Sequence, residues 1–204
     1  MKTSKFLSTA VLTVIFMGTT SVFSQDKMMK ENKMAKDKKM MAMDAKMVGG
    51  AAMYPTMDIV SNAVNSADHT TLVAAVKAAG LVETLQGSGP FTVFAPTNAA
   101  FDKLPMGTVE TLLKPENKTK LQGVLTYHVL AGKFSAKDIV KAIKKGKGMA
   151  AFTTVNGAKL TAMLDGDKVK LKDASGNIST VTIADVNQSN GVIHVVDTLV
   201  LPGM

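Results

Sequence analysis

The 204-residue sequence contains no cysteine, no tryptophan and no arginine. Without cysteine the chain has no disulfide framework, no thiolate metal site, no cysteine nucleophile and no acylated lipoprotein anchor. All 24 basic residues are lysines, which lack the forked donor set that recognises phosphate or guanine in a bidentate manner. The formal charge of +8 is therefore a weak argument for sequence-specific DNA or RNA recognition. We expect no nucleic-acid partner.

The first 24 residues have the features of a secretory signal peptide. Lys2 and Lys5 precede an apolar run that ends near Met17, and small residues lead to Gln25. The run is too short and too interrupted by serine and threonine for a spanning helix, and no second long apolar stretch follows. We expect cleavage after Ser24, no transmembrane anchor in the mature chain, and a secreted, periplasmic or extracellular location.

Residues 25–53 differ sharply in composition from the rest of the chain. They contain seven lysines and eight methionines, with Val48 as the only branched aliphatic residue. This composition predicts a flexible basic arm that ends at Gly49-Gly50, before a folded domain over residues 54–204. The arm is interpreted as a solvated tether, as a segment attracted to anionic surfaces, or as a soft-metal site. Thioethers favour Cu(I), and the candidate ligands are Met40, Met41, Met43 and Met47.

Residues 54–204 change their hydrophobic period halfway along, and 46% of the whole chain is hydrophobic, which is enough for a sizeable core. Helical spacing over 72–82 follows the candidate N-caps Asp68 and Thr70, and Ser135 precedes another helical stretch. The second half reads as strands separated by the turn pairs Asn-Gly, Asp-Gly and Ser-Gly at 156–157, 165–166 and 175–176. The pattern predicts an α+β domain with antiparallel strands mostly in the second half.

Three stretches together resemble one family, the fasciclin-like domains. They read GPFTVFAPTNAAF at residues 89–101, LTYHVL at 125–130 and NGVIHVVDTLVLP at 190–202. Their order and spacing agree with that family over about residues 57–202. The resemblance implies a β-sandwich or wedge with helices packed alongside, in secreted or surface proteins that bind cells, matrix or protein partners.

The resemblance also implies where partners bind. Metazoan members are read as engaging integrins through the Tyr-His motif, here Tyr127 and His128, and through an Asp-Ile dipeptide. Asp185 and Val186 stand at that dipeptide, and the valine puts integrin-type recognition in doubt. Some members bind apolar pigments such as carotenoids, so a small apolar ligand is the alternative. The expected partner is therefore a cell-surface or matrix protein or glycan, with no cofactor.

The remaining motif residues have ordinary structural interpretations. Strand-like alternation across Tyr127 and His128 predicts that one of the two is buried. His194 lies in a run that is apolar on both faces, which favours a core histidine bonded to a neighbour over a ligand. We expect mainly structural roles for Thr92, Phe94, Pro96, Thr97, Asn98, Phe101, Gly191, His194 and Asp197.

An enzymatic function has little support in the sequence. The three histidines, His69, His128 and His194, are far apart along the chain. Neither a nucleophile elbow nor a phosphate-binding loop occurs, and Gly87-Ser88-Gly89 precedes a strand rather than opening a helix. We therefore predict a non-enzymatic adhesion or binding module.

Overall fold

A computed structural model describes residues 45–203 of the chain. The predicted signal peptide and most of the predicted basic arm, including Met40, Met41 and Met43, lie outside the described residues. Within that part of the chain, no helix is both long and apolar enough to cross a membrane. The helices, with the two short 3₁₀ turns η1 and η2, are α2 (Ile59–Ala63), η1 (Ala67–His69), α3 (Thr70–Ala79), α4 (Val82–Gln86), α5 (Asn98–Asp102), α6 (Thr108–Leu113), η2 (Pro115–Asn117), α7 (Lys118–Tyr127) and α8 (Ala136–Lys145).

The strands form one large sheet and one separate hairpin. The hairpin pairs β1 with β2, and the large sheet has the order β4-β3-β9-β8-β7-β6-β5. Its only parallel pair is β3 with β9; the other neighbours are antiparallel. The strands are β1 (Lys46–Val48), β2 (Ala51–Met53), β3 (Phe91–Pro96), β4 (Val129–Ala131), β5 (Met149–Thr153), β6 (Lys159–Asp165), β7 (Lys168–Lys172), β8 (Ile178–Gln188) and β9 (Gly191–Val196).

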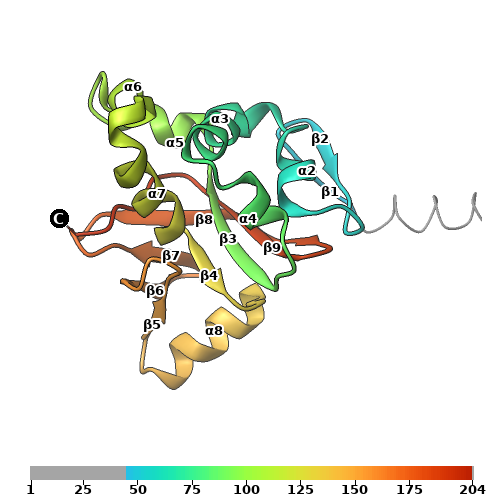
Figure 1. The fold of residues 1–204 in the computed structure, drawn as a ribbon. Coiled ribbons are helices and arrows are strands. Elements are labelled where there is room, and N and C mark those ends of the chain that lie inside the picture. The colour runs from blue at the N-terminus through green and yellow to red at the C-terminus, as the bar shows by residue number, and fades with distance from the viewer. Residues whose placement is uncertain (1–44, 204) are drawn as a thin grey trace, which may run out of the picture. The chain divides into compact units, whose positions relative to one another are not determined.

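The two outer strands of the large sheet approach each other, so that the sheet nearly closes. Leu130 in the middle of β4 forms an isolated bridge with Thr154, just after β5. The Val155 N–H also donates to the Val129 carbonyl oxygen at 2.8 Å. Helices α2 to α7 gather on one side of the sheet, and α8 lies on the other side near β5 and β6 (Figure 1). The predicted α+β class is confirmed.

Two hydrophobic cores explain why the central strands are apolar on both faces. On β3, Val93 and Ala95 belong to the core under the helices, whereas Phe94 belongs to the core under α8. On β9, Ile193 and Val195 face the first core and Val196 the second. Successive strand residues point to opposite faces, so a strand covered on both sides needs continuous apolar sequence.

The turns of the second half follow the predicted glycine chemistry. Gly157, Gly166 and Gly176 have φ values of 86°, 59° and 90°, and they lie between β5 and β6, β6 and β7, and β7 and β8. Only glycine, asparagine and aspartate enter this left-handed region readily. These turns allow four strands to follow one another as an antiparallel meander.

The start of the domain differs from the prediction. Residues 46–53 form the β1–β2 hairpin instead of the end of a flexible arm, and Val48 and Met53 are each only 2% exposed, inside the first core. Gly49 and Gly50 form the tight turn of this hairpin, with φ values of 56° and 75°. Val48, directly before the Gly-Gly pair, and Met53, three residues after it, suffice for this short hairpin to pack when a helical layer supplies the surface.

Candidate binding site

The Tyr-His motif lies at the end of a helix and not in a strand. Helix α7 ends at Tyr127, and His128 precedes β4. The expectation that only one of the two is buried is wrong: the side chains are 0% and 2% exposed, because the end of α7 directs both into the interior of the domain. A partner cannot touch either side chain on the folded domain. Val186 of the Asp-Val dipeptide is also fully buried.

Both buried side chains of this motif join distant segments. The Tyr127 hydroxyl donates to the Lys159 carbonyl oxygen at 2.9 Å, which links α7 to β6. His128 Nδ1 lies 2.8 Å from the Val124 carbonyl oxygen, and its Nε2 accepts from the Val200 N–H at 3.2 Å. These partners assign a neutral ring with the proton on Nδ1. Burial lowers the pKa of His128 to about 4, so the ring stays neutral at ordinary pH.

A second group of motif residues holds the segment that runs from the end of β4 to the first residue of α8, residues 132–136. The Thr92 hydroxyl donates to the Gly132 carbonyl oxygen at 2.7 Å and accepts from the Phe134 N–H at 2.8 Å. His194 Nε2 lies 2.9 Å from the Phe134 carbonyl oxygen. Since an amide N–H and two carbonyl oxygens are fixed by buried side chains, this surface segment has a defined shape. We call residues 132–136 the clamped loop.

Asp185 completes the clamp from β8. Its backbone N–H donates to His194 Nδ1 at 3.2 Å, and its carboxylate accepts from the Ala136 N–H, the first amide of α8, at 2.7 Å. Asp185 has a φ of 56° and lies at an irregularity in the β8–β9 pairing. A bulge redirects a side chain out of the regular alternation, and here it brings a carboxylate to a helix N-terminus, where negative charge is stabilised.

The bonds of His194 fix its tautomer. Nε2 faces a carbonyl oxygen and Nδ1 faces an N–H, so the neutral ring carries its proton on Nε2. Burial lowers the pKa of His194, and the ring of Phe94 stacks on it with centroids 5.6 Å apart. In this state the histidine acts as a rigid connection between β9, β8 and the clamped loop.

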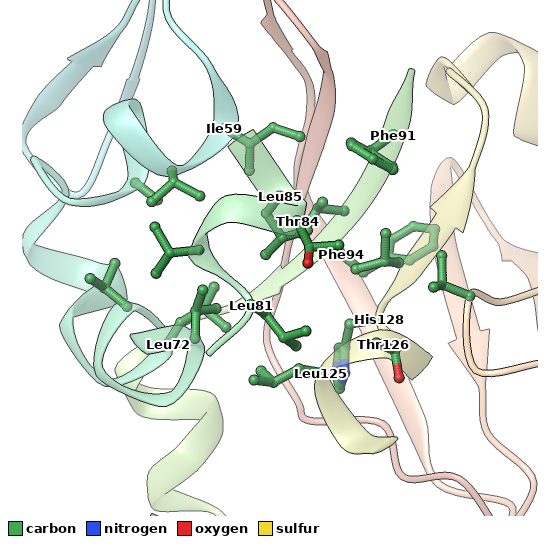
Figure 2. Close-up of a pocket in the computed structure, with 18 of the residues that line it drawn as sticks. Ile59, Leu72, Leu81, Thr84, Leu85, Phe91, Phe94, Leu125, Thr126 and His128 are labelled. Atoms are coloured by element: carbon green, nitrogen blue, oxygen red, sulfur yellow. The ribbon is translucent and has the colours of Figure 1, made fainter. Parts of the chain in front are cut away.

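An apolar cavity lies between the helical layer and the sheet. Side chains from α2, α3 and α4 face those of β3 and the end of α7, with His128 and Thr126 at one side (Figure 2). The cavity volume is about 70 Å³. Its lining is almost entirely aliphatic and aromatic, and Lys77 and Thr84 are exposed polar residues among the residues around it. The sequence led us to expect a crevice between helices and sheet for an apolar ligand but named none of its residues, because they read as ordinary core positions of three separate helices.

The comparison with known families decides the identity of the fold. The profile of the Fasciclin domain matches residues 67–202. The chain belongs to the fasciclin domain family. Fasciclin domains are known for adhesion and binding, typically without enzymatic activity.

Several bacterial proteins are similar to this fasciclin domain. Protein sll1483 of Synechocystis is 50% identical over 157 residues, which cover 77% of this chain and 80% of the relative. Immunogenic protein MPB70 of Mycobacterium bovis is 35% identical over 145 residues, covering 69% and 66% of the two chains. The cell surface glycolipoprotein MPB83 of the same species is 34% identical over 160 residues, covering 76% and 64%.

A solved structure shares the fasciclin fold. It is a FAS1 domain pair from the insect cell adhesion molecule Fasciclin I, with a TM-score of 0.63 and 17% sequence identity. The match covers 72% of this chain and 52% of the insect chain, so the chain spans about half the length of that pair. At this identity the likeness concerns the fold alone.

The other residues of the two fasciclin signatures shape the framework. Thr97 caps α5 by accepting from the Ala100 N–H at 3.3 Å, and Phe101 on that helix is buried in the first core. A Cβ atom on Gly191 would lie 2.1 Å from the Phe91 carbonyl oxygen, so β9 requires glycine there to approach β3. Pro96, also buried, ends β3 opposite Val196.

Asn98 and Asp197 act across longer distances. Asn98 Oδ1 accepts from the Thr71 N–H at 3.0 Å, and its Nδ2 donates to the Ala67 carbonyl oxygen at 2.9 Å. Asn98 thus caps α3 from a distant part of the chain, and neither Asp68 nor Thr70 serves as the expected local cap. The carboxylate of Asp197 accepts from the Thr180 N–H at 2.8 Å, which joins the end of β9 to β8.

The methionine hypothesis stays a prediction. Of its four candidate ligands, only Met47 lies among the described residues, where it is 61% exposed on β1. Within those residues, histidine, aspartate and glutamate form no cluster of three that suits a metal ion.

Proposed function

We propose that this protein is an exported, non-enzymatic binding module that attaches to a protein or glycan of a cell surface or extracellular matrix. The observation that carries the proposal is the clamped loop, because the side chains of Thr92, His194 and Asp185 all form hydrogen bonds to its backbone. A loop that is fixed before binding loses less conformational freedom on association. Lys133 is exposed within this loop, so the loop offers a side chain to a partner.

The location and the lack of catalysis have separate support. The N-terminal segment has signal-peptide features, and MPB83 is described as a cell surface glycolipoprotein. The ring nitrogens of His128 and His194 are all within hydrogen-bond distance of backbone groups, which leaves neither ring free to move a proton. Partner contacts run through the clamped loop, while the buried Tyr127 and His128 support the fold beneath it.

The test compares two aspartates that hold different parts of the same sheet. Mature protein starting at Gln25 is titrated onto cells and matrix material from the source, as wild type, Asp185→Ala and Asp197→Ala. Wild type is expected to bind saturably, and Asp185→Ala to bind several-fold more weakly because its clamp on α8 is lost. Asp197→Ala, which leaves the clamped loop untouched, should bind as wild type. Absence of saturable binding by wild type, or equal loss in both variants, would contradict the proposal.

A second candidate function, the carriage of a small apolar ligand, is favoured by the apolar cavity. Its volume of about 70 Å³ is under half that of the roughly 150 Å³ cavity that binds benzene. A carotenoid is much larger, so its binding requires the helical layer to open. Helices α2 and α4 have five residues each, too few to be stable without tertiary packing, and so they are the elements that would move.

Ligand carriage is tested by two observations. Protein purified from its source should show a visible absorption band or extractable lipid. Nile red should also bind, and Leu81→Trp at the cavity should reduce that binding, whereas Leu113→Trp on α6 should not. A colourless, lipid-free preparation that does not bind Nile red would exclude this function.

A further inference from the structure

The positive charge of the domain is concentrated in one part of the chain. Residues 131–172 contain ten lysines and three aspartates, whereas the rest of residues 45–203 contains six lysines and nine acidic residues. Helix α8 and its flanks contribute six of those ten lysines, at 133, 137, 141, 144, 145 and 147. The only ion pair in the described part of the chain joins Lys170 to Asp165, on β7 and β6, so none of these six is paired.

The lysines of α8 are only partly explained by the stability of the helix. Lys144 and Lys145 lie in its last turn, where positive charge interacts favourably with the helix dipole. Lys137 lies in the first turn, where the dipole disfavours a cation, and Lys137 with Lys141 and Lys141 with Lys145 are like-charged pairs four residues apart. Asp138, the single acid of the helix, is bonded to Ser135 in a capping box.

Lys147 has an unfavourable backbone conformation. Its φ of 55° lies in the left-handed region, between Gly146 and Gly148. A glycine there would avoid the steric cost that a side chain brings. Stability alone therefore does not explain a lysine at this position.

A groove runs beside this helix. Its volume is about 380 Å³, and it is lined by Ala136 and Val140 of α8, by the start of β7 and by β8. Side chains follow one another by about 100° around a helix, so Lys144, Lys137 and Lys141 come next after Ala136 and Val140 on the side away from the core. Lys168 lies in the groove lining itself. Lysines therefore lie both in the lining and along the α8 side of the groove.

The lining of the groove offers both polar and apolar contacts. It contains the side chains of Thr180 and Thr182 beside Val169 and Val181, and Asp167 is the one acidic side chain within it. Hydroxyl groups next to short aliphatic surface suit a hydroxyl-rich ring, and the surrounding ammonium groups suit a ligand with repeated negative charge.

We propose that this groove and the lysines of α8 form the docking site for an acidic polysaccharide. This inference rests on the proposed function, of which it names the partner class. A protein partner is disfavoured here, because interface centres are rich in aromatic residues and arginine and poor in lysine. A flat bilayer does not fill a groove, and the apolar residues Ile139 and Ile143 of α8 are buried in the domain, so the helix has no apolar face to insert.

The lysines act as separated point charges in this site. Lysine presents a compact ammonium on a flexible stem and does not fix one geometry, in contrast to the planar fork of arginine. The site therefore favours a polymer with carboxylates at intervals, bound in several registers, over a single small anion. Binding of this kind weakens as salt screens the charges, with a screening length of about 10 Å at 0.1 M.

The test measures binding of the mature protein to polygalacturonate, with neutral dextran and vesicles containing phosphatidylglycerol as further probes. Three proteins are compared: wild type, K137Q/K141Q/K144Q on α8, and K114Q/K118Q/K120Q around the start of α7, which loses the same charge. Circular dichroism confirms that each is folded. The α8 variant should bind polygalacturonate about tenfold more weakly or worse, because each lysine near an anionic surface contributes roughly a fivefold change. The α7 variant should change binding little.

A fourth protein tests the groove. Thr182→Tyr fills it without altering charge, and a tyrosine suits a strand position. It should weaken binding to polygalacturonate and leave the attraction to vesicles unchanged. Equal losses in the two lysine variants, or binding to vesicles alone, would overturn the polysaccharide site. If wild type binds its cells saturably but ignores polygalacturonate, this inference fails while the proposed function stands. If wild type binds nothing, the proposed function fails as well.

Discussion

The fasciclin signature residues and the lysines of α8 meet at the clamped loop, yet their surroundings are opposite. Thr92, His128 and His194 are at most 2% exposed and form hydrogen bonds to backbone groups. The lysines that follow them in space are exposed and unpaired within the described residues. The fasciclin signature residues therefore support the clamped loop from beneath. The residues that suit a partner, the lysines of α8, lie outside the signature motifs.

The largest expected effect is on the buried side of this comparison. Tyr127→Ala removes a fully buried aromatic side chain and should lower the free energy of unfolding by about 3 to 5 kcal/mol. Tyr127→Phe keeps the ring, loses only the bond to Lys159, and should cost about 1 kcal/mol. Urea denaturation measures both values. If Tyr127→Phe abolished partner binding at unchanged stability, Tyr127 would have a role at the contact.

Acid should act next most strongly, again through the buried side. His128 has a pKa of about 4 in the folded domain and an ordinary value of 6.5 when unfolded, so the unfolded chain binds more protons between those values. The neutral His128 therefore does not reduce the free energy of unfolding above pH 6.5, and this free energy decreases as the pH falls from 6.5 towards 4. At about 1.4 kcal/mol for each pKa unit, His128 alone contributes up to about 3 kcal/mol. Urea titrations from pH 7 to pH 4 measure the slope.

The pH prediction has a direct control. His69 and His194 also have pKa values lowered by burial, so they add to the same trend. His128→Gln should reduce the dependence on pH without abolishing it. A pH dependence identical to that of wild type would show that His128 does not carry the effect.

The clamp itself is tested by Thr92→Val, which is similar in shape but lacks the hydroxyl. The Phe134 N–H and the Gly132 carbonyl oxygen then lose their partner, which should cost about 1 to 3 kcal/mol. Hydrogen exchange should quicken at Phe134 and at the start of α8, and Thr92→Ser should restore most of the protection. If hydrogen exchange in this segment were unchanged in Thr92→Val, the Thr92 hydroxyl would not be what holds the clamped loop. The contrast between buried supporting residues and an exposed binding surface would then fail.

The sequence predicted the elements that depend on neighbouring residues. The glycine turns of the meander and the Ser135 cap of α8 are both local, and both are confirmed. Signature motifs were sufficient for the family and the fold class. These features need only a few consecutive residues to be recognised.

The sequence did not predict what depends on distant segments. The cap of α3 comes from Asn98, and Asp185 reaches α8 only because an irregular β8 has a residue with positive φ. The sequence around Tyr127 and His128 predicts a strand instead of a helix end, because four apolar or aromatic residues give no clear period. The groove beside α8 combines three separate elements, although the lysines at 137, 141 and 145 are a helical pattern that was open to inspection.

The smallest expected effect separates stability from binding at one position. Lys147→Gly removes both a charge and a side chain held at φ 55°. Glycine relieves the left-handed strain but loses more entropy on folding, so the net stabilisation should be a few tenths of a kcal/mol, measured by urea denaturation. Binding to polygalacturonate should weaken at the same time. The opposite signs of the changes in stability and in affinity matter more than their sizes. If Lys147 served stability, its replacement would destabilise the protein, whereas if it serves a partner, its replacement weakens only binding.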